Sequence, residues 1–201
     1  MTSTWFFIVL EVAVIACGLV SGFFLTFSDF LMRSLNLAKT AAGVEVMQII
    51  NREVWRSVII ILLWGMVALS IILASYAFLN MTGPSSVLVM VGGALYFLGV
   101  LVVSYVFNIP MNNRLDAMEY SGTEAAAYWK NTYMPRWVFW NYVRAITSGG
   151  AAICFLMACV LLAQGAIVTG LVFRLLDKSI NSKLSGDRTW TLVPSLNPVN
   201  I

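Results

Sequence analysis

The chain has 201 residues, of which 60% are hydrophobic and only 10% are charged, and its formal net charge is +3. A soluble domain carries roughly 25% charged residues, so the composition is that of a membrane protein, and its scattered basic residues argue against nucleic-acid binding. The chain contains no histidine, which removes the commonest protein ligand of zinc, copper and iron and the usual general base near neutral pH. We therefore expect no metal site, and any chemistry must proceed without imidazole.

Four segments are long and apolar enough to cross a bilayer, because a span needs about 20 mostly apolar residues. They run from about residue 5 to 27, from 54 to 79, from 87 to 107 and from 137 to 173. The first lacks a preceding basic segment and is too long for a signal peptide, so we expect it to remain as a transmembrane helix. The spans predict an all-α fold, with a four-helix transmembrane domain over residues 1–176 and a C-terminal extramembrane tail over 177–201.

The connections between the spans differ greatly in length. The second and third spans are joined by the short turn "NMTGPSS", whereas residues 28–53 and 108–136 form long polar connections that must share one membrane face. Eight of the twelve Lys and Arg residues lie in or beside these long connections, and four lie in or just before the tail. The excess of positive charge favours a cytoplasmic location for the long connections, with both termini on the opposite face.

The second long connection is predicted to contain a short interfacial helix before the fourth span. "SGTE", from Ser121 to Glu124, has the spacing of a capping box, and the helix-forming run "AAAYWK" follows it. Pro135 is expected to interrupt this helix before the span begins. After Asp177 the sequence is rich in Ser, Asn and Pro and has little periodicity, which predicts an extended tail.

Polar uncharged side chains gather at the ends of three spans, all on the side of the long connections. The groups are Gln48 with Asn51, Asn108 with Asn112 and Asn113, and Trp137 with Asn141 and Arg144. Members of the first group are three apart and those of the last are four and three apart, so each of these two groups lies on one helical face. Arg144 lies inside an apolar run and needs an acceptor or an anion, because an unpaired charge there is costly.

Two interpretations of these amides remain open. Amides near the ends of membrane helices commonly tie neighbouring helices together through hydrogen bonds, and this role is favoured for any one of them alone. For the whole set, convergence on one side of the bundle favours a polar pocket that binds a ligand as much as it favours the structural role.

The sequence resembles the anthrone oxygenase-like family of small four-helix membrane proteins. The resemblance extends over about residues 8–172 and rests on four motifs in order, "FSDFLMRSL", "GVEVMQIIN", "FNIPMNNRL" and "WKNTYMPRWVFWNYVRAI". It implies a helical bundle whose polar motifs meet at one membrane face. Some fungal relatives oxidise anthrones to anthraquinones with molecular oxygen and no evident metal or organic cofactor, whereas most bacterial relatives have no established activity. The resemblance is therefore more specific for the fold than for the reaction.

If the activity is shared, the protein must hold a flat aromatic compound, remove a proton and stabilise the resulting oxyanion. We assign the last task, as the catalytic set, to hydrogen-bond donors on Asn108, Asn112, Asn141 and Arg144. Substrate binding is assigned to Gln48, Asn51, Trp137 and Trp140. The nearest carboxylates in the sequence are Asp29, Glu45 and Asp116, and none is a compelling general base. We expect no resident cofactor.

Three functions fit the sequence. The first is a cofactor-independent oxygenase acting on polycyclic phenols. The second is a non-catalytic accessory subunit of a larger membrane protein complex, with the tail as its docking element. The third is a protein that binds a hydrophobic aromatic ligand or a lipid without turnover. The intact amide motifs favour the first and third functions, whereas the unusual tail favours the second. The lipid bilayer is a partner in all three.

Overall fold

The computed structural model describes residues 4–184. Within this range every regular element is a helix and no strand occurs. The chain divides into two compact units, Met1–Leu162 and Ala163–Ile201. In the second unit, the described residues continue the last helix to Leu184.

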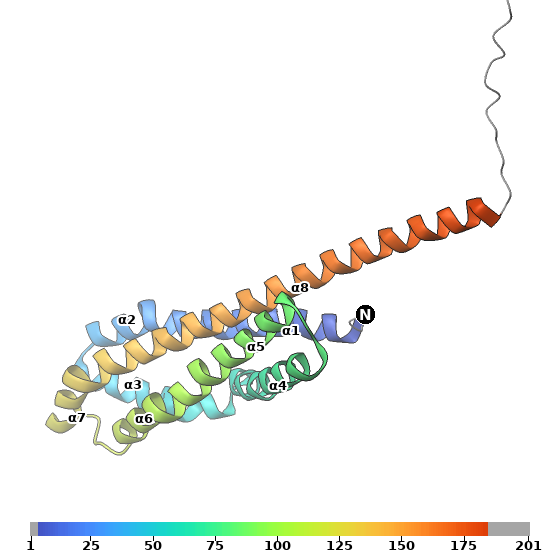
Figure 1. Cartoon of the computed structure of the whole chain (residues 1–201). Coiled ribbons are helices and arrows are strands. Elements are labelled where there is room, and N and C mark those ends of the chain that lie inside the picture. The colour runs from blue at the N-terminus through green and yellow to red at the C-terminus, as the bar shows by residue number, and fades with distance from the viewer. Residues whose placement is uncertain (1–3, 185–201) are drawn as a thin grey trace, which may run out of the picture. The chain divides into compact units, whose positions relative to one another are not determined.

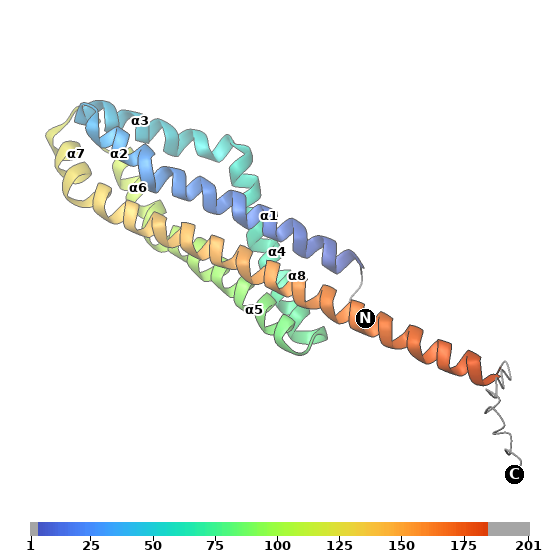
Figure 2. The same ribbon diagram turned by 90° about the horizontal axis from the view of Figure 1, so that it is seen from above.

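The first unit is a helical bundle formed by α1 (Thr4–Thr26), α4 (Val58–Asn80), α5 (Pro84–Tyr96) and the first part of α8 (Met134–Leu184), as Figures 1 and 2 show. Four helical segments are long and apolar enough to span a membrane, which confirms the predicted all-α, four-span architecture. They are Thr4–Leu37, Val58–Asn80, Pro84–Asp116 and Thr123–Lys178. The three cysteines are free, and Cys17 and Cys159 are buried among the apolar side chains of the bundle.

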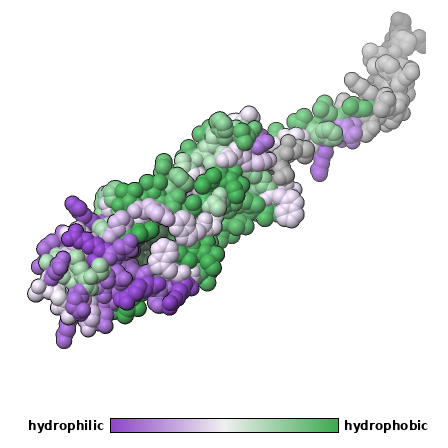
Figure 3. Space-filling view, turned by 90° about the horizontal axis from the view of Figure 1, so that it is seen from below, coloured by the Kyte–Doolittle hydropathy of each residue, from purple (hydrophilic) through white to green (hydrophobic). Residues whose placement is uncertain are grey.

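The long polar connections are themselves helical. They contain α2 (Met32–Leu37), α3 (Thr40–Glu53), the short 3-10 turn η2 (Val54–Arg56), α6 (Ile109–Asp116) and α7 (Thr123–Tyr128). Helices α2, α3, α6 and α7, which we call the helical cap, gather at one end of the bundle, whereas the start of α1 and the α4–α5 turn lie at the other (Figure 1). Hydrophilic residues concentrate at the cap end and hydrophobic ones over the bundle (Figure 3). Which side of the membrane the cap occupies stays a prediction.

Four short π-helical turns interrupt the regular α-helical hydrogen bonding. They are η1 (Phe27–Leu31), η3 (Phe97–Val102), η4 (Ser104–Asn108) and η5 (Trp129–Tyr133). Pro110 and Pro135 each follow the end of such a turn by two residues, after η4 and η5 respectively. Proline has no N–H to donate and its ring crowds the preceding helical turn, so the wider π-turn accommodates it. The predicted interruption at Pro135 is therefore wrong, because α7, η5 and α8 follow one another without a break.

The short helix predicted before the fourth span is present, but its start differs from the prediction. Helix α7 begins at Thr123 with Gly122 as its N-cap, and no side chain caps it. The Ser121 hydroxyl instead donates to Glu119 Oε1 at 3.1 Å, so the capping box is not formed. At the other end α8 continues to Leu184, so the first part of the predicted extended tail is helical. The rest of that tail lies outside the described residues.

Candidate functional site

A cavity of about 120 Å³ lies where the bundle meets the helical cap. Its walls come from α1, α3, α4, α6, α8, the 3-10 turn η2 and the π-turns η1, η3 and η4, so it depends on elements that are far apart in the sequence. Most of the lining is aromatic or aliphatic. The polar lining residues are Asn51, Ser104, Tyr105, Asn112, Asn141 and Arg144, together with the indoles of Trp55, Trp64 and Trp137.

Arg144 is the charged residue of this lining, and its side chain is held on several sides. It is only 8% exposed. Its Nη1 donates to the Ser104 hydroxyl at 3.2 Å, and its Nη2 donates to Asn141 Oδ1. The guanidinium carbon lies 4.3 Å from the centre of the Phe24 ring and 5.6 Å from that of Trp137. Aromatic faces attract a cation, so Arg144 is fixed against the cavity wall.

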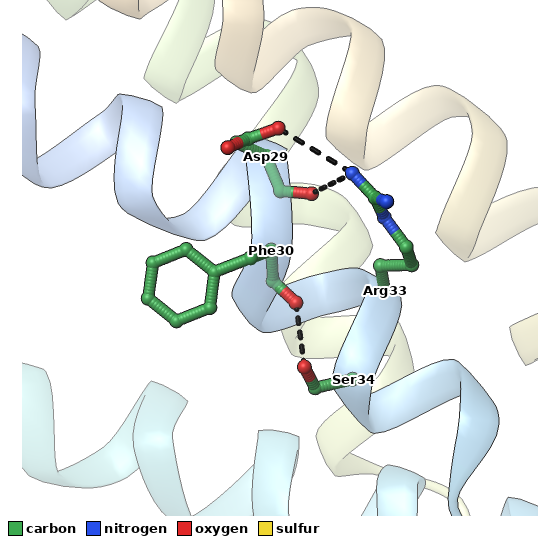
Figure 4. Close-up of polar contacts among 4 residues, drawn as sticks. All are labelled: Asp29, Phe30, Arg33 and Ser34. Atoms are coloured by element: carbon green, nitrogen blue, oxygen red, sulfur yellow. Dashed lines mark hydrogen bonds and ion pairs between the residues drawn. The ribbon is translucent and has the colours of Figure 1, made fainter.

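No carboxylate pairs with Arg144 in the part of the chain that the structure describes. The ion pairs found there join exposed or half-exposed side chains, Arg33 with Asp29 at 3.5 Å, Arg52 with Asp116 at 3.1 Å and Arg56 with Glu53 at 3.4 Å. Figure 4 shows the first of these, in which Arg33 also donates to the Asp29 carbonyl. Glu45 is exposed on α3. The three carboxylates nearest the motifs therefore lie outside the cavity lining.

Arg144 Nε is a buried donor on a lining residue that has no partner among the described residues. The Asn51 side chain, also in the lining, interacts with the Tyr133 hydroxyl. A buried donor left unpaired costs roughly 1–3 kcal/mol. The unpaired acceptor Asn108 Oδ1 belongs to a residue that does not line the cavity. The lining therefore contains one positive charge that is incompletely paired, which suits a ligand that presents a negatively charged oxygen or a carbonyl.

Asn141 positions Arg144 and joins α8 to the end of α1. Its Nδ2 donates to the Phe24 carbonyl and to the Ser28 hydroxyl, both at 2.6 Å. With its amide nitrogen used in this way, its Oδ1 faces the guanidinium of Arg144 and accepts from it. Ser28 is buried within η1. The amide thus serves both as a tie between helices and as part of the cavity wall.

Asn112 holds two side chains of the aromatic wall in place through hydrogen bonds. Its Oδ1 accepts hydrogen bonds from the Tyr133 hydroxyl at 2.8 Å and from Trp137 Nε1 at 2.7 Å. The rings of Tyr133 and Trp137 are stacked, with centroids 6.0 Å apart and planes 19° apart. One side-chain oxygen from α6 therefore fixes two aromatic rings from the segment that leads into α8.

We expect Asn112→Leu to lower the free energy of unfolding by about 2 kcal/mol or more, because two donors lose their acceptor at a cost of roughly 1–3 kcal/mol each. Thermal unfolding in detergent measures the change. Asn113→Leu is the matched control, because Asn113 is the next residue but is exposed, and exposed positions usually change stability by less than about 0.5 kcal/mol. Equal effects of the two changes would contradict this role for Asn112.

Five of the eight residues that the sequence assigned to a site line the cavity, namely Asn51, Asn112, Trp137, Asn141 and Arg144. The other three lie outside it and make contacts between helices. Gln48 Nε2 donates to the Leu115 carbonyl at 2.8 Å and to the Met118 carbonyl at 2.9 Å.

Asn108 and Trp140 are also turned away from the cavity. Asn108 is fully buried, and its Nδ2 donates to the Trp137 carbonyl at 3.3 Å. Trp140 stacks on Phe107, with ring centroids 3.6 Å apart and planes 5° apart. Both residues thus connect the end of the third span to α8, which for Asn108 is the structural role that the sequence left open.

Sequence reasoning missed the wall contributed by α1 and the side that faces α4. Phe23, Phe24 and Phe27 line the cavity from the first span and its π-turn, and nothing in an apolar run distinguishes such residues from others. Ser104 was also missed. It lies four residues before Asn108, and this spacing, which is that of one helical face, could have indicated it.

Comparison with known proteins extends these observations. Residues 55–154, about half of the chain, match the family model described as anthrone oxygenase. The match contains Ser104, Asn112, Trp137, Asn141 and Arg144 from the cavity. No curated protein and no solved structure matches the chain. Together with the helical bundle and its four candidate spans, the match identifies the chain as a member of the anthrone oxygenase-like family.

Proposed function

We propose that the protein binds an aromatic phenol or anthrone in this cavity and catalyses its oxidation by molecular oxygen. The observation that carries the proposal is the buried Arg144, which has no carboxylate partner among the described residues and whose Nε is unpaired there, in a cavity walled by aromatic rings. A flat aromatic ligand with an anionic oxygen would contact the rings of Phe24 and Trp137 and place that oxygen beside Arg144. The family match supports an anthrone as the substrate class.

Arg144 would then make the substrate more acidic. An anthrone loses a proton from its ring CH₂ group to form an enolate whose charge lies mainly on oxygen. A fixed cation in a largely apolar cavity stabilises such a charge, and it needs no reorganisation as the charge forms. Because no carboxylate lines the cavity, the proton passes to water. Arg144 is the residue on which the rate depends most.

The reaction with oxygen then balances without a cofactor. The enolate gives one electron to O₂, and the resulting superoxide and substrate radical join through a new C–O bond. The peroxide anion takes up a proton to become a hydroperoxide. Loss of the remaining C–H proton, with cleavage of the O–O bond and departure of hydroxide, gives the second carbonyl and one water. One anthrone and one O₂ yield one anthraquinone and one H₂O.

Oxygen uptake and anthraquinone absorbance, measured together on the full-length protein in detergent, test this function. We expect the protein to accelerate anthrone oxidation above the rate in detergent alone, with O₂ and anthrone consumed in equal amounts, and we expect no reaction without oxygen. A rate equal to that of the detergent blank would overturn the proposed oxygenase activity.

The same protein preparation distinguishes the ligand-binding function from the accessory-subunit function. Binding of anthraquinone without any acceleration of oxidation would favour a ligand-binding protein. If neither is found, extraction from native membranes in mild detergent tests the accessory-subunit function, because stoichiometric recovery with a larger complex would be its signature. Removal of residues 185–201 would then show whether the tail is the docking element.

A further inference from the structure

The cavity reaches the protein surface at one flank. Three lining residues are exposed, Trp55 by 53%, Trp64 by 39% and Tyr105 by 58%. The remaining lining residues are buried or half-buried. All three exposed residues are aromatic and uncharged, and they come from η2, α4 and η4. The opening of the cavity therefore lies between the start of α4 and η4.

Apolar surface borders this opening along α4 and η4, whereas the exposed side chains of Glu53 and Arg56 flank it beside Trp55. Val58 and Ile61 are exposed on α4, and Val102 and Val106 are exposed on the segment that carries Tyr105. Trp64 and Tyr105 both lie within segments that qualify as membrane spans. Toward the helical cap, the lining residues of α3 and α6 are buried or half-buried. The opening thus faces the lipid-exposed flank of the bundle.

One aromatic contact crosses the opening. The rings of Trp64 and Tyr105 meet edge to face, with centroids 6.1 Å apart and planes 75° apart. Such a pair is worth about 0.5–1.5 kcal/mol beyond the area that it buries, so thermal motion separates the rings easily. Tyr105 is held in the π-turn η4, a type of turn that occurs frequently at functional sites.

We propose that the ligand enters and leaves the cavity sideways, from the bilayer, between Trp64 and Tyr105. The substrate is accordingly an uncharged, lipophilic polycyclic phenol or anthrone that dissolves in the membrane and ionises only beside Arg144. An anion would have to give up its hydration to cross the apolar rim, which is costly. This inference rests on the proposed function, because it assumes that the cavity binds such a ligand.

Ligand exchange kinetics test the route. The full-length protein in phosphatidylcholine vesicles is mixed with dihydroxyanthraquinone, a probe that is already oxidised, and binding is followed by quenching of tryptophan fluorescence. We expect Tyr105→Ala to raise the association rate by about fivefold, because removal of the ring leaves the route between the bilayer and the cavity open. Tyr105→Phe retains the ring and should exchange as the wild type does. Phe78→Ala, a change at an exposed aromatic of α4 outside the cavity, is the control for the lipid-facing surface.

A second measurement uses the unaltered protein and so does not depend on the folding of a variant. Anthraquinone sulfonate has the same flat rings but a permanent negative charge, and we expect it to associate at least about tenfold more slowly than the uncharged probe. Equal association rates for the two probes, or unchanged rates in Tyr105→Ala, would overturn the lateral route.

Failure of the proposed ligand-binding function would give a different result from failure of the lateral route. If the wild-type protein binds no dihydroxyanthraquinone, or if Arg144→Met binds it as tightly as the wild type does, then the cavity is not a site for this ligand. If binding depends on Arg144 but exchange does not depend on Tyr105, the proposed site stands and the lateral route alone is wrong.

Discussion

Replacing Arg144 by methionine is expected to abolish ligand binding and anthrone oxidation in a protein that remains folded. The guanidinium is the charged group of the cavity lining, and it faces no carboxylate among the described residues. Removing one preorganised donor from a site that stabilises an oxyanion typically lowers the rate by about 10²–10³-fold, and here the charge is lost with it. The dissociation constant for dihydroxyanthraquinone and the rate of oxygen uptake measure the effect.

The stability of the same variant gives a second, independent result. The change removes a buried cation that has no anionic partner, which relieves a desolvation cost. It also deprives Asn141 Oδ1 and Ser104 Oγ of the donors that they face. Because these contributions oppose each other, we expect the free energy of unfolding to change by less than about 2 kcal/mol. Unfolding in detergent measures this change.

Arg136→Met is the matched control for Arg144→Met. Arg136 lies two helical turns earlier on α8, is exposed and does not line the cavity. It should bind ligand and consume oxygen as the wild type does. Unimpaired turnover by Arg144→Met, or an equal loss in both variants, would contradict the assigned role of Arg144.

Gly93→Ala is expected to lower the stability of the bundle substantially. A Cβ at this position would lie 2.8 Å from the Ser70 carbonyl oxygen and 2.9 Å from Ala74 Cβ. Neither atom can rotate away, because one belongs to the backbone of α4 and the other is fixed directly to it. Adding an atom to a closely packed interior typically costs about 1–3 kcal/mol, and separation of α4 from α5 would also disturb the cavity wall that α4 supplies.

Gly65→Ala provides the matched comparison. Gly65 also lies within α4, but a Cβ added there meets no atom within 4 Å. Alanine has a higher helix propensity than glycine by up to about 1 kcal/mol, so this variant should be as stable as the wild type or slightly more so. Thermal unfolding of both variants in the same detergent measures the difference between their stabilities. A Gly93→Ala protein as stable as Gly65→Ala would show that the α4–α5 interface is less tightly packed than the structure indicates.

The sequence predicted a helix in the second long connection and put Gln48 and Asn51 on one helical face, but it did not predict that the first long connection is helical along most of its length. In α3 the buried residues include Val44, Met47, Gln48 and Asn51, and their spacing of three, one and three is typical of one helical face. The polar composition of the segment obscured this pattern. Composition separates membrane spans from their connections, but it does not separate a polar loop from an amphipathic helix that packs on a bundle.

The sequence also could not distinguish Asn108 from Asn112. The two residues are four apart in one motif, so regular α-helical periodicity puts them on the same face. Asn108 is the last residue of the π-turn η4, whereas Asn112 lies within α6. Asn108 bonds to the backbone of α8, whereas Asn112 lines the cavity.

The four spans, the end of the bundle at which the polar motifs gather and the absence of histidine were all accessible from the sequence. The spans and their polar ends follow from local hydropathy and composition, because the bilayer acts on each segment independently. Contacts between distant segments, in contrast, fix which amides line the cavity, put the phenylalanines of α1 in one of its walls and leave no carboxylate in its lining. Each of these depends on contacts such as that of Asn141 with Phe24, which are 117 residues apart, and local sequence carries no information about such pairings.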